Sequence, residues 1–122
     1  MNELVKFAEW TFFSEVAVPS DVTAMLLSNE KAVCAYKTIR DVAVFTNKRL
    51  IVRDAQGITG KKVETYSLPY SSIVMWSTEN AGKIDLNSEV ELWTKAGHVK
   101  INLKKNIDIR KFDMILAAAI MG

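Results

Sequence analysis

The sequence predicts a mainly β fold with helices at both ends: seven antiparallel strands in two orthogonally packed sheets, capped by a C-terminal helix. Three observations lead to this fold class. Short apolar and β-branched runs alternate with polar residues between positions 30 and 105, and turn residues separate these runs. An apolar stripe at helical spacing follows over positions 106–121. Since seven short strands cannot leave their edges and faces bare, we expect the sheets to bend into a partly open barrel with the last helix across one end.

Length and composition indicate a single domain over residues 1–122, with helical residues 1–29, strands over 30–105 and a final helix over 106–121. The 16 basic and 14 acidic residues nearly balance, so charge alone gives no reason to expect nucleic-acid binding. Cys34 is the only cysteine, which excludes an intramolecular disulfide. The chain has no signal-peptide pattern and no apolar run of about 20 residues. We therefore expect a cytoplasmic protein.

Residues 2–16 are expected to form the first helix, because apolar residues such as Ala8 and Phe12 recur at three- and four-residue steps. This segment is rich in large apolar side chains, with Trp10 and Phe13 beside Phe12. Two interpretations remain open. The helix packs on the core of its own chain, or it contributes Trp10, Phe12 and Phe13 to a subunit interface, where aromatic residues are enriched.

A second short helix is expected to begin at Ser20 or Asp21 and to end near Leu27. The seven strands follow, and Pro69 ends one of them because proline cannot donate to a strand ladder. Their expected ranges are 32–39, 43–46, 49–54, 62–68, 73–79, 89–94 and 98–103. Asn106 or Asp108 is expected to cap the final helix. The apolar stripe of that helix consists of Ile109, Phe112, Ile115, Leu116, Ala119 and Ile120.

Several motifs make the central part of the chain similar to the bacterial pleckstrin-homology-like family, over roughly Leu26 to Leu116. The first block contains Arg40-Asp41, Phe45-Thr46-Asn47-Lys48-Arg49-Leu50, Asp54, Gly57-Ile58-Thr59-Gly60-Lys61-Lys62 and Pro69-Tyr70. The second contains Glu79-Asn80-Ala81-Gly82, Asp85 and Glu89. The resemblance implies a pleckstrin-like barrel and a small, non-enzymatic, cytoplasmic bacterial domain. Family members like this one tend to assemble as ring-like homo-oligomers.

Basic residues near the first turns offer a second functional hypothesis, the binding of an anionic lipid or a phosphorylated ligand at a membrane surface. Several cations are needed to hold several phosphates. The alternative is that these residues serve turn formation and local ion pairs. The candidates are Lys37, Arg40, Lys48, Arg49, Lys61 and Lys62.

The segment from Gly57 to Lys62 is not a nucleotide-binding phosphate loop. Position 62 is lysine where that motif has serine or threonine, and a strand follows where a helix is required. We therefore expect a hairpin loop.

No catalytic, metal-binding or cofactor-binding constellation stands out. His98 is a lone histidine expected at an exposed turn, and Cys34 is expected as a small buried residue. The carboxylates Asp85, Glu89 and Glu91 do not follow calcium-loop spacing. The sequence therefore favours a non-enzymatic interaction module that forms homo-oligomers and binds another protein at a sheet edge or at the barrel mouth, with the anionic ligand as the alternative.

Overall fold

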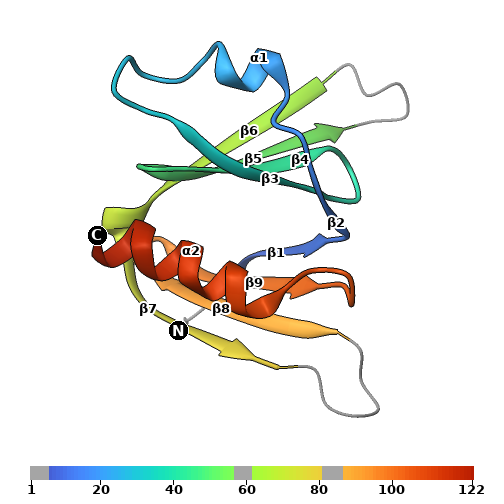
Figure 1. Ribbon diagram of the computed structural model, residues 1–122, viewed down its shortest axis with the longest axis vertical. Helices are drawn as coiled ribbons and strands as arrows, with labels where there is room; N and C mark the ends of the chain where they lie inside the picture. The colour runs from blue at the N-terminus through green and yellow to red at the C-terminus, as the bar shows by residue number, and fades with distance from the viewer. Residues whose placement is uncertain (1–5, 57–61, 81–86) are drawn as a thin grey trace.

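The computed structural model describes residues 6–56, 62–80 and 87–122, and they form two β-sheets with a helix across the front (Figure 1). The four-stranded sheet has the order β1-β9-β8-β7. Its strands are β1 (Lys6–Phe12), β7 (Ile73–Glu79), β8 (Ser88–Thr94) and β9 (Gly97–Leu103). The five-stranded sheet has the order β2-β3-β4-β5-β6. Its strands are β2 (Ser14–Val16), β3 (Ala32–Lys37), β4 (Val42–Thr46), β5 (Arg49–Gln56) and β6 (Lys62–Pro69).

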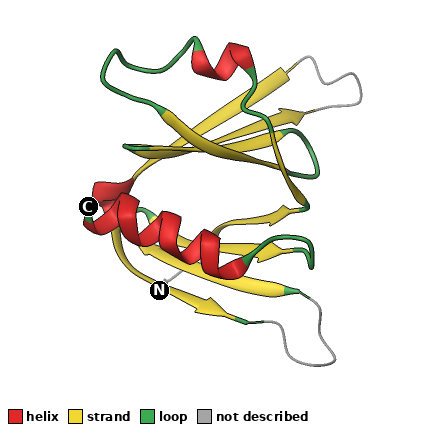
Figure 2. Ribbon diagram, viewed as in Figure 1, coloured by secondary structure: helices red, strands yellow, loops and turns green. Residues whose placement is uncertain are grey.

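Two chain segments join the sheets. β1 continues into β2 with only Phe13 between them, and β6 passes into β7 through the short 3-10 helix η1 (Tyr70–Ser72). The strand end expected at Pro69 therefore occurs where the chain leaves one sheet for the other. Figure 2 shows the two layers of strands, with α2 (Ile109–Met121) lying in front of the space between them.

The prediction of a helix over residues 2–16 is wrong, because the described part of that segment forms β1 and β2. β1 lies parallel to β9, with Trp10 opposite Ile101 and Phe12 opposite Leu103. β2 lies antiparallel to β3. The described residues therefore contain nine strands, two more than expected, and one of the strand pairs is parallel. The seven strands that the sequence predicted are all present, with bounds that differ by at most two residues.

An aromatic cluster fills the space between the sheets. Its members Phe12, Tyr36, Phe45 and Phe112 are at most 1% exposed. Phe12 stacks on Tyr36 with the ring centroids 5.5 Å apart. Since Phe12 lies inside its own chain, its assignment to a subunit interface is wrong. Burial of each such ring stabilises the fold by about 1.5–3 kcal/mol relative to exposure.

The five-stranded sheet is covered on its outer face as well. The short helix α1 (Ser20–Thr23) places Val22 over a second cluster that includes Val44 and Ile51. Arg53 on β5 holds this helix in place, because it bonds Asp41 at 2.6 Å and Asp21 at 2.5 Å. The helix is shorter than the expected range, which extended to Leu27. With both faces covered, every residue of β4 is buried.

α2 confirms the predicted C-terminal helix and one of its two candidate caps. The Asp108 carboxylate accepts hydrogen bonds from the backbone N–H groups of Arg110 and Lys111, at 3.0 and 3.2 Å. Phe112 and Leu116 then project into the core. Asp113 accepts a 3.0 Å hydrogen bond from Trp76 Nε1 on β7, which ties the helix to the four-stranded sheet.

Candidate functional site

The candidate anion-binding residues do not gather at one place. Lys37, Arg40 and Lys62 lie where β3 ends, β4 begins and β6 begins, at one end of the five-stranded sheet. Lys48 and Arg49 lie at the opposite end, where Lys48 is in the turn between β4 and β5 and Arg49 is the first residue of β5. The five residues of β4 separate the two ends by about 13 Å, at roughly 3.3 Å per residue. A single ligand of phosphate size cannot contact both groups.

The remaining candidate, Lys61, lies outside the described residues, as do the rest of the glycine-containing loop and Asp85. Arg40 is an exposed side chain with its Nε 3.6 Å from Asp54 Oδ1. Ion pairs of this kind contribute little to stability, because water and salt screen them.

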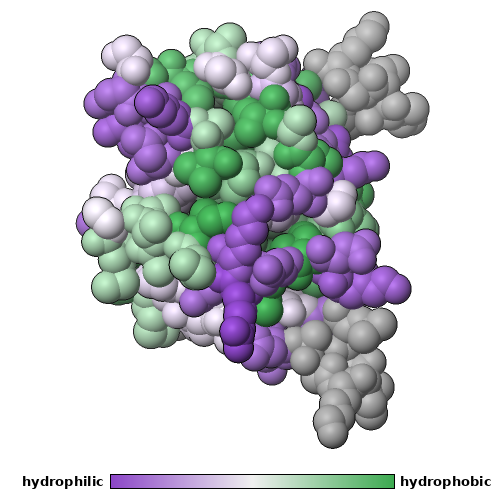
Figure 3. All heavy atoms as spheres, in the orientation of Figure 1, coloured by the Kyte–Doolittle hydropathy of each residue, from purple (hydrophilic) through white to green (hydrophobic). Residues whose placement is uncertain are grey.

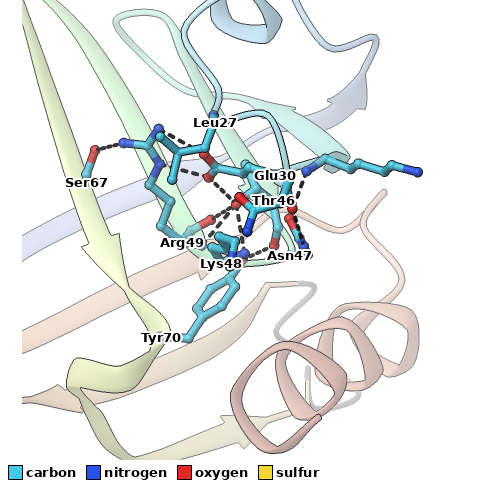
Figure 4. Close-up of polar contacts among 10 residues, drawn as sticks. Leu27, Glu30, Thr46, Asn47, Lys48, Arg49, Ser67 and Tyr70 are labelled. Carbon is cyan, nitrogen blue, oxygen red and sulfur yellow. Dashed lines mark hydrogen bonds and ion pairs between the residues drawn. The ribbon is translucent and has the colours of Figure 1, made fainter.

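Arg49 belongs to a buried polar cluster rather than to an open surface (Figure 4). Its Nε and Nη2 donate to the two carboxylate oxygens of Glu30 at 2.8 and 3.1 Å. Its Nη1 donates to Ser67 Oγ at 3.0 Å. The Thr46 hydroxyl also donates to Glu30, at 2.7 Å. The Glu30 side chain has no exposed area, so the Arg49 guanidinium neutralises a charge that water does not reach.

The Glu30 carboxylate is stable in its ionised form. The hydrogen bond from Arg49 lowers the pKa of Glu30 from its ordinary 4.5 to about 2, although desolvation acts in the opposite direction. Neighbouring contacts hold the end of β4 and the turn that follows it. The backbone N–H of Lys31 donates to Asn47 Oδ1 at 2.8 Å, and Tyr70 Oη donates to the Thr46 carbonyl at 2.7 Å. For Arg49, the contacts therefore match the alternative of turn formation and local ion pairs.

The other two candidate interface residues are partly buried. Trp10 packs against Tyr66, with ring centroids 6.2 Å apart. Phe13 lies under Lys104, whose Nζ is 5.8 Å from the ring centroid. Each keeps some accessible surface, unlike Phe12.

The cysteine and the histidine, residue types often used in catalysis or metal binding, pack against other side chains of the fold. Burial raises the pKa of the Cys34 thiol, which disfavours the reactive thiolate. His98 is half-buried rather than exposed, because it stacks on Trp93 at 5.1 Å and pairs with Glu91. Within the described ranges, no group of three or more histidine, cysteine or acidic side chains is placed to hold a metal ion. None of the helices described here has the length and apolar character needed to cross a membrane.

A groove of about 510 Å³ runs between α2 and the five-stranded sheet. Apolar side chains dominate it, and two of them are well exposed, with Val33 at 56% and Met114 at 72%. Its lining consists of Val33, Thr46, Asn47, Asp108, Arg110, Lys111, Met114, Ile115, Ala118 and Ala119. One hint of the groove is visible in the sequence, because Met114 is a large apolar residue outside the apolar stripe of α2.

A second apolar surface lies on β7, which is an edge strand of the four-stranded sheet. Val74 is 72% exposed and Met75 is 52% exposed. The strand carries no charged residue between Ile73 and Thr78. Exposed strand edges in natural proteins usually carry charges or proline, which discourage pairing with another strand.

Comparison with known proteins finds one matching family and several similar proteins. The model of the family described as Bacterial PH domain matches residues 4–120. The uncharacterized protein YjqA of Bacillus subtilis (strain 168) is 44% identical over 111 residues, which are 88% of this chain and 89% of the relative. A second uncharacterized protein of the same organism, YozO, is 30% identical over 93 residues, or 76% of this chain and 81% of that protein.

Solved structures agree with the sequence comparison. A DUF1696 family protein with a pleckstrin-homology domain from Shewanella loihica PV-4 superposes with a TM-score of 0.80 and 37% identity, over 88% of this chain and 96% of that one. A pleckstrin homology domain from Shewanella amazonensis SB2B has a TM-score of 0.67 and 38% identity, over 84% of this chain and 85% of the other.

Proposed function

Because the chain belongs to the bacterial PH domain family, as the sequence motifs indicated, we propose that it is a non-enzymatic cytoplasmic interaction module. In this proposal it assembles with copies of itself into a closed ring and binds protein partners. The uncharged, exposed edge of β7 is the observation that carries the self-assembly.

The two outer strands that meet at η1 differ in how they are protected. β6 carries Lys62 and Glu64 along its edge, whereas β7 presents Val74 and Met75 and has no charge before Glu79. An edge strand has backbone N–H and C=O groups without a partner on one side. Pairing with a strand of another copy satisfies these groups and buries the two apolar side chains. When each copy uses two different surfaces to contact its neighbours, the copies form a closed ring if the rotation from one copy to the next adds up to a full turn.

Light scattering on the full-length chain at micromolar concentration tests the assembly. We expect a mass of several copies for the natural sequence and a lower mass for Val74→Lys/Met75→Lys, because charges on this edge oppose strand pairing. The matched control is Val63→Lys on β6, another exposed apolar residue on an edge strand, which should leave the mass unchanged. A monomer at this concentration, or equal masses for all three chains, contradicts the proposal.

One observation favours the anionic ligand as a second candidate. Lys37, Arg40 and Lys62 are all exposed at the same end of the five-stranded sheet, on the side that one flat surface such as a membrane would contact. Vesicles with an acidic lipid should then co-sediment with the chain at low salt and less so as salt increases. Binding should weaken in Lys37→Ala/Lys62→Ala and not in Lys95→Ala, in the turn between β8 and β9. Absence of binding even to strongly acidic vesicles excludes this candidate.

A further inference from the structure

The groove along α2 begins where a strand of the sheet ends. β2 pairs with β3 only at Ala35–Lys37, so on this side the earlier residues of β3 face no strand of the described structure. α2 runs beside the same edge, because Lys111 Nζ bonds Glu15 of β2 at 2.9 Å. The groove, lined by Val33 and α2, therefore continues the line of β2 along β3.

The surfaces of the groove suit an extended chain. Val33 and Ile115 form apolar walls, and the small side chains of Ala118 and Ala119 permit close approach to the helix. Met114 is flexible and adapts to different side chains. In Figure 3, hydrophobic surface (green) lies where α2 faces the five-stranded sheet, with hydrophilic side chains (purple) on both sides. The volume is within the range of about 300–1,000 Å³ typical of ligand sites.

The surroundings of the groove favour an acidic ligand. Arg110 lines the groove. Lys31 directly precedes β3 in the sequence, and Lys48 directly follows Asn47, which also lines the groove. All three basic side chains are exposed. The acidic residues nearby are already engaged by partners within the chain. Asp108 caps α2, Glu15 pairs with Lys111, and Glu30 pairs with Arg49. Charge complementarity therefore selects negative charge in the ligand.

We propose that this groove binds an extended segment of a partner protein, with apolar residues at alternate positions and acidic residues between them. The segment adds to β3 as a short strand in the line of β2. Its apolar side chains point into the groove, and its acidic side chains face Arg110 and the neighbouring lysines. Strand addition supplies backbone hydrogen bonds, and the groove selects side chains. This inference rests on the proposed function, since it assigns the partner-binding part of that function to a surface.

Selection from a random hexapeptide display library on the immobilised full chain tests the proposal. We expect enriched peptides in which apolar and acidic residues alternate. Met114→Glu and Ala118→Glu, both at exposed positions of α2 that line the groove, should weaken a selected peptide by about tenfold or more, because they place negative charge in an apolar, acid-binding site. Met121→Glu is the matched control, since Met121 is 76% exposed on the same helix and does not line the groove.

Backbone pairing has its own readout. N-methylation of alternate peptide amides should abolish binding for the set that faces β3 and spare the other set. Equal effects of both sets would overturn strand addition. A selection that enriches no sequence, or peptides that bind Met114→Glu and Ala118→Glu as well as the natural chain, overturns the site. Thermal unfolding of each variant verifies that it is folded.

Light scattering on the same variants separates this inference from self-assembly through β7. If Met114→Glu lowers the assembly mass, the groove is an interface between copies and the partner segment is excluded. If the natural chain is a monomer that still binds acidic, alternating peptides in the groove, the self-assembly proposal fails and the groove assignment stands. If only Val74→Lys/Met75→Lys lowers the mass, the two surfaces are independent.

Discussion

Glu30 carries a negative charge at a position closed to water, and its four hydrogen bonds explain how the fold tolerates this. Both of its oxygens accept from Arg49, one also accepts from Thr46, and the other from the backbone N–H of Leu27. A buried charge is costly unless it is paired and fully hydrogen-bonded. The cluster connects the loop before β3 to the turn between β4 and β5, two segments that approach only in the folded chain.

This arrangement makes the stability of the fold depend on pH. The folded-state pKa of Glu30 lies below its ordinary value of 4.5, so its contribution is present above pH 4.5 and is lost as pH falls toward 2. The shift corresponds to about 3 kcal/mol. We expect Glu30→Gln to lower the unfolding free energy by about 2–4 kcal/mol at pH 7, because Arg49 loses a charged partner. Urea unfolding measures this difference in unfolding free energy between the variant and the natural chain. The difference should be present at pH 7 and mostly lost at pH 2.5.

Glu79→Gln, an exposed change at the end of β7, serves as the control and should be nearly neutral at both pH values. A Glu30→Gln deficit that is equally large at both would show that packing, and not ionisation, makes the contribution.

The same cluster explains why the sequence alone suggested Arg49 as an anion-binding residue. Its charge is visible there, but its partner stands 19 positions earlier, across a loop and two strands. Nothing local in the sequence reveals that pairing.

At the scale of the element, β1 was the least predictable part of the fold. Residues four apart lie on one face of a helix, and they also lie on one face of a strand, because four is a multiple of two. Ala8 and Phe12 therefore fit both patterns. Pairing with β9 decides between them, and a partner strand more than 80 residues away leaves no mark in the local pattern. The cap of α2 was predictable, because Asp108 and the helix it caps are adjacent in the chain.

β1 should be essential to the core, and single substitutions can measure this. Phe12→Ala should lower the unfolding free energy by about 3–5 kcal/mol, since it opens a cavity among Tyr36, Phe45 and Phe112. Phe13→Ala, one residue on and only partly buried, should cost less than half as much. Urea unfolding monitored by circular dichroism gives both values. Equal losses would contradict the description of Phe12 as fully buried and Phe13 as only partly buried.

At the scale of the whole molecule, the layers differ in how well they are shielded. β4 is central in its sheet and buried at every position, whereas β7 is an edge strand with most of its side chains exposed. Regions with few buried contacts open more easily than the core. Hydrogen exchange monitored by mass spectrometry should therefore show slow exchange in β4 and faster exchange in β7. The natural chain at low concentration is the reference.

Raising the protein concentration adds an internal comparison. Self-assembly through β7 should slow exchange in that strand and leave β4 unchanged. Protection of β7 equal to that of β4 in a monomeric sample would contradict the layer description.

The fold class was predictable because each of the seven strands has its own alternation and each turn its own residues. The groove was not, since its two walls, at Val33 and along α2, come from opposite ends of the chain. Each wall looks ordinary alone. Only their packing places an apolar surface beside a strand edge that β2 leaves uncovered.

The parallel pairing of β1 with β9 has a consequence for synthesis on the ribosome. Glu9 and Asn102, which hydrogen-bond across this pair, are 93 positions apart. Translation at about 5–20 residues per second leaves roughly 5 to 20 seconds between the appearance of these two residues. During that interval Trp10 and Phe12 have been made while β9 has not. The nascent chain therefore carries two large aromatic side chains without their native partner strand during that period.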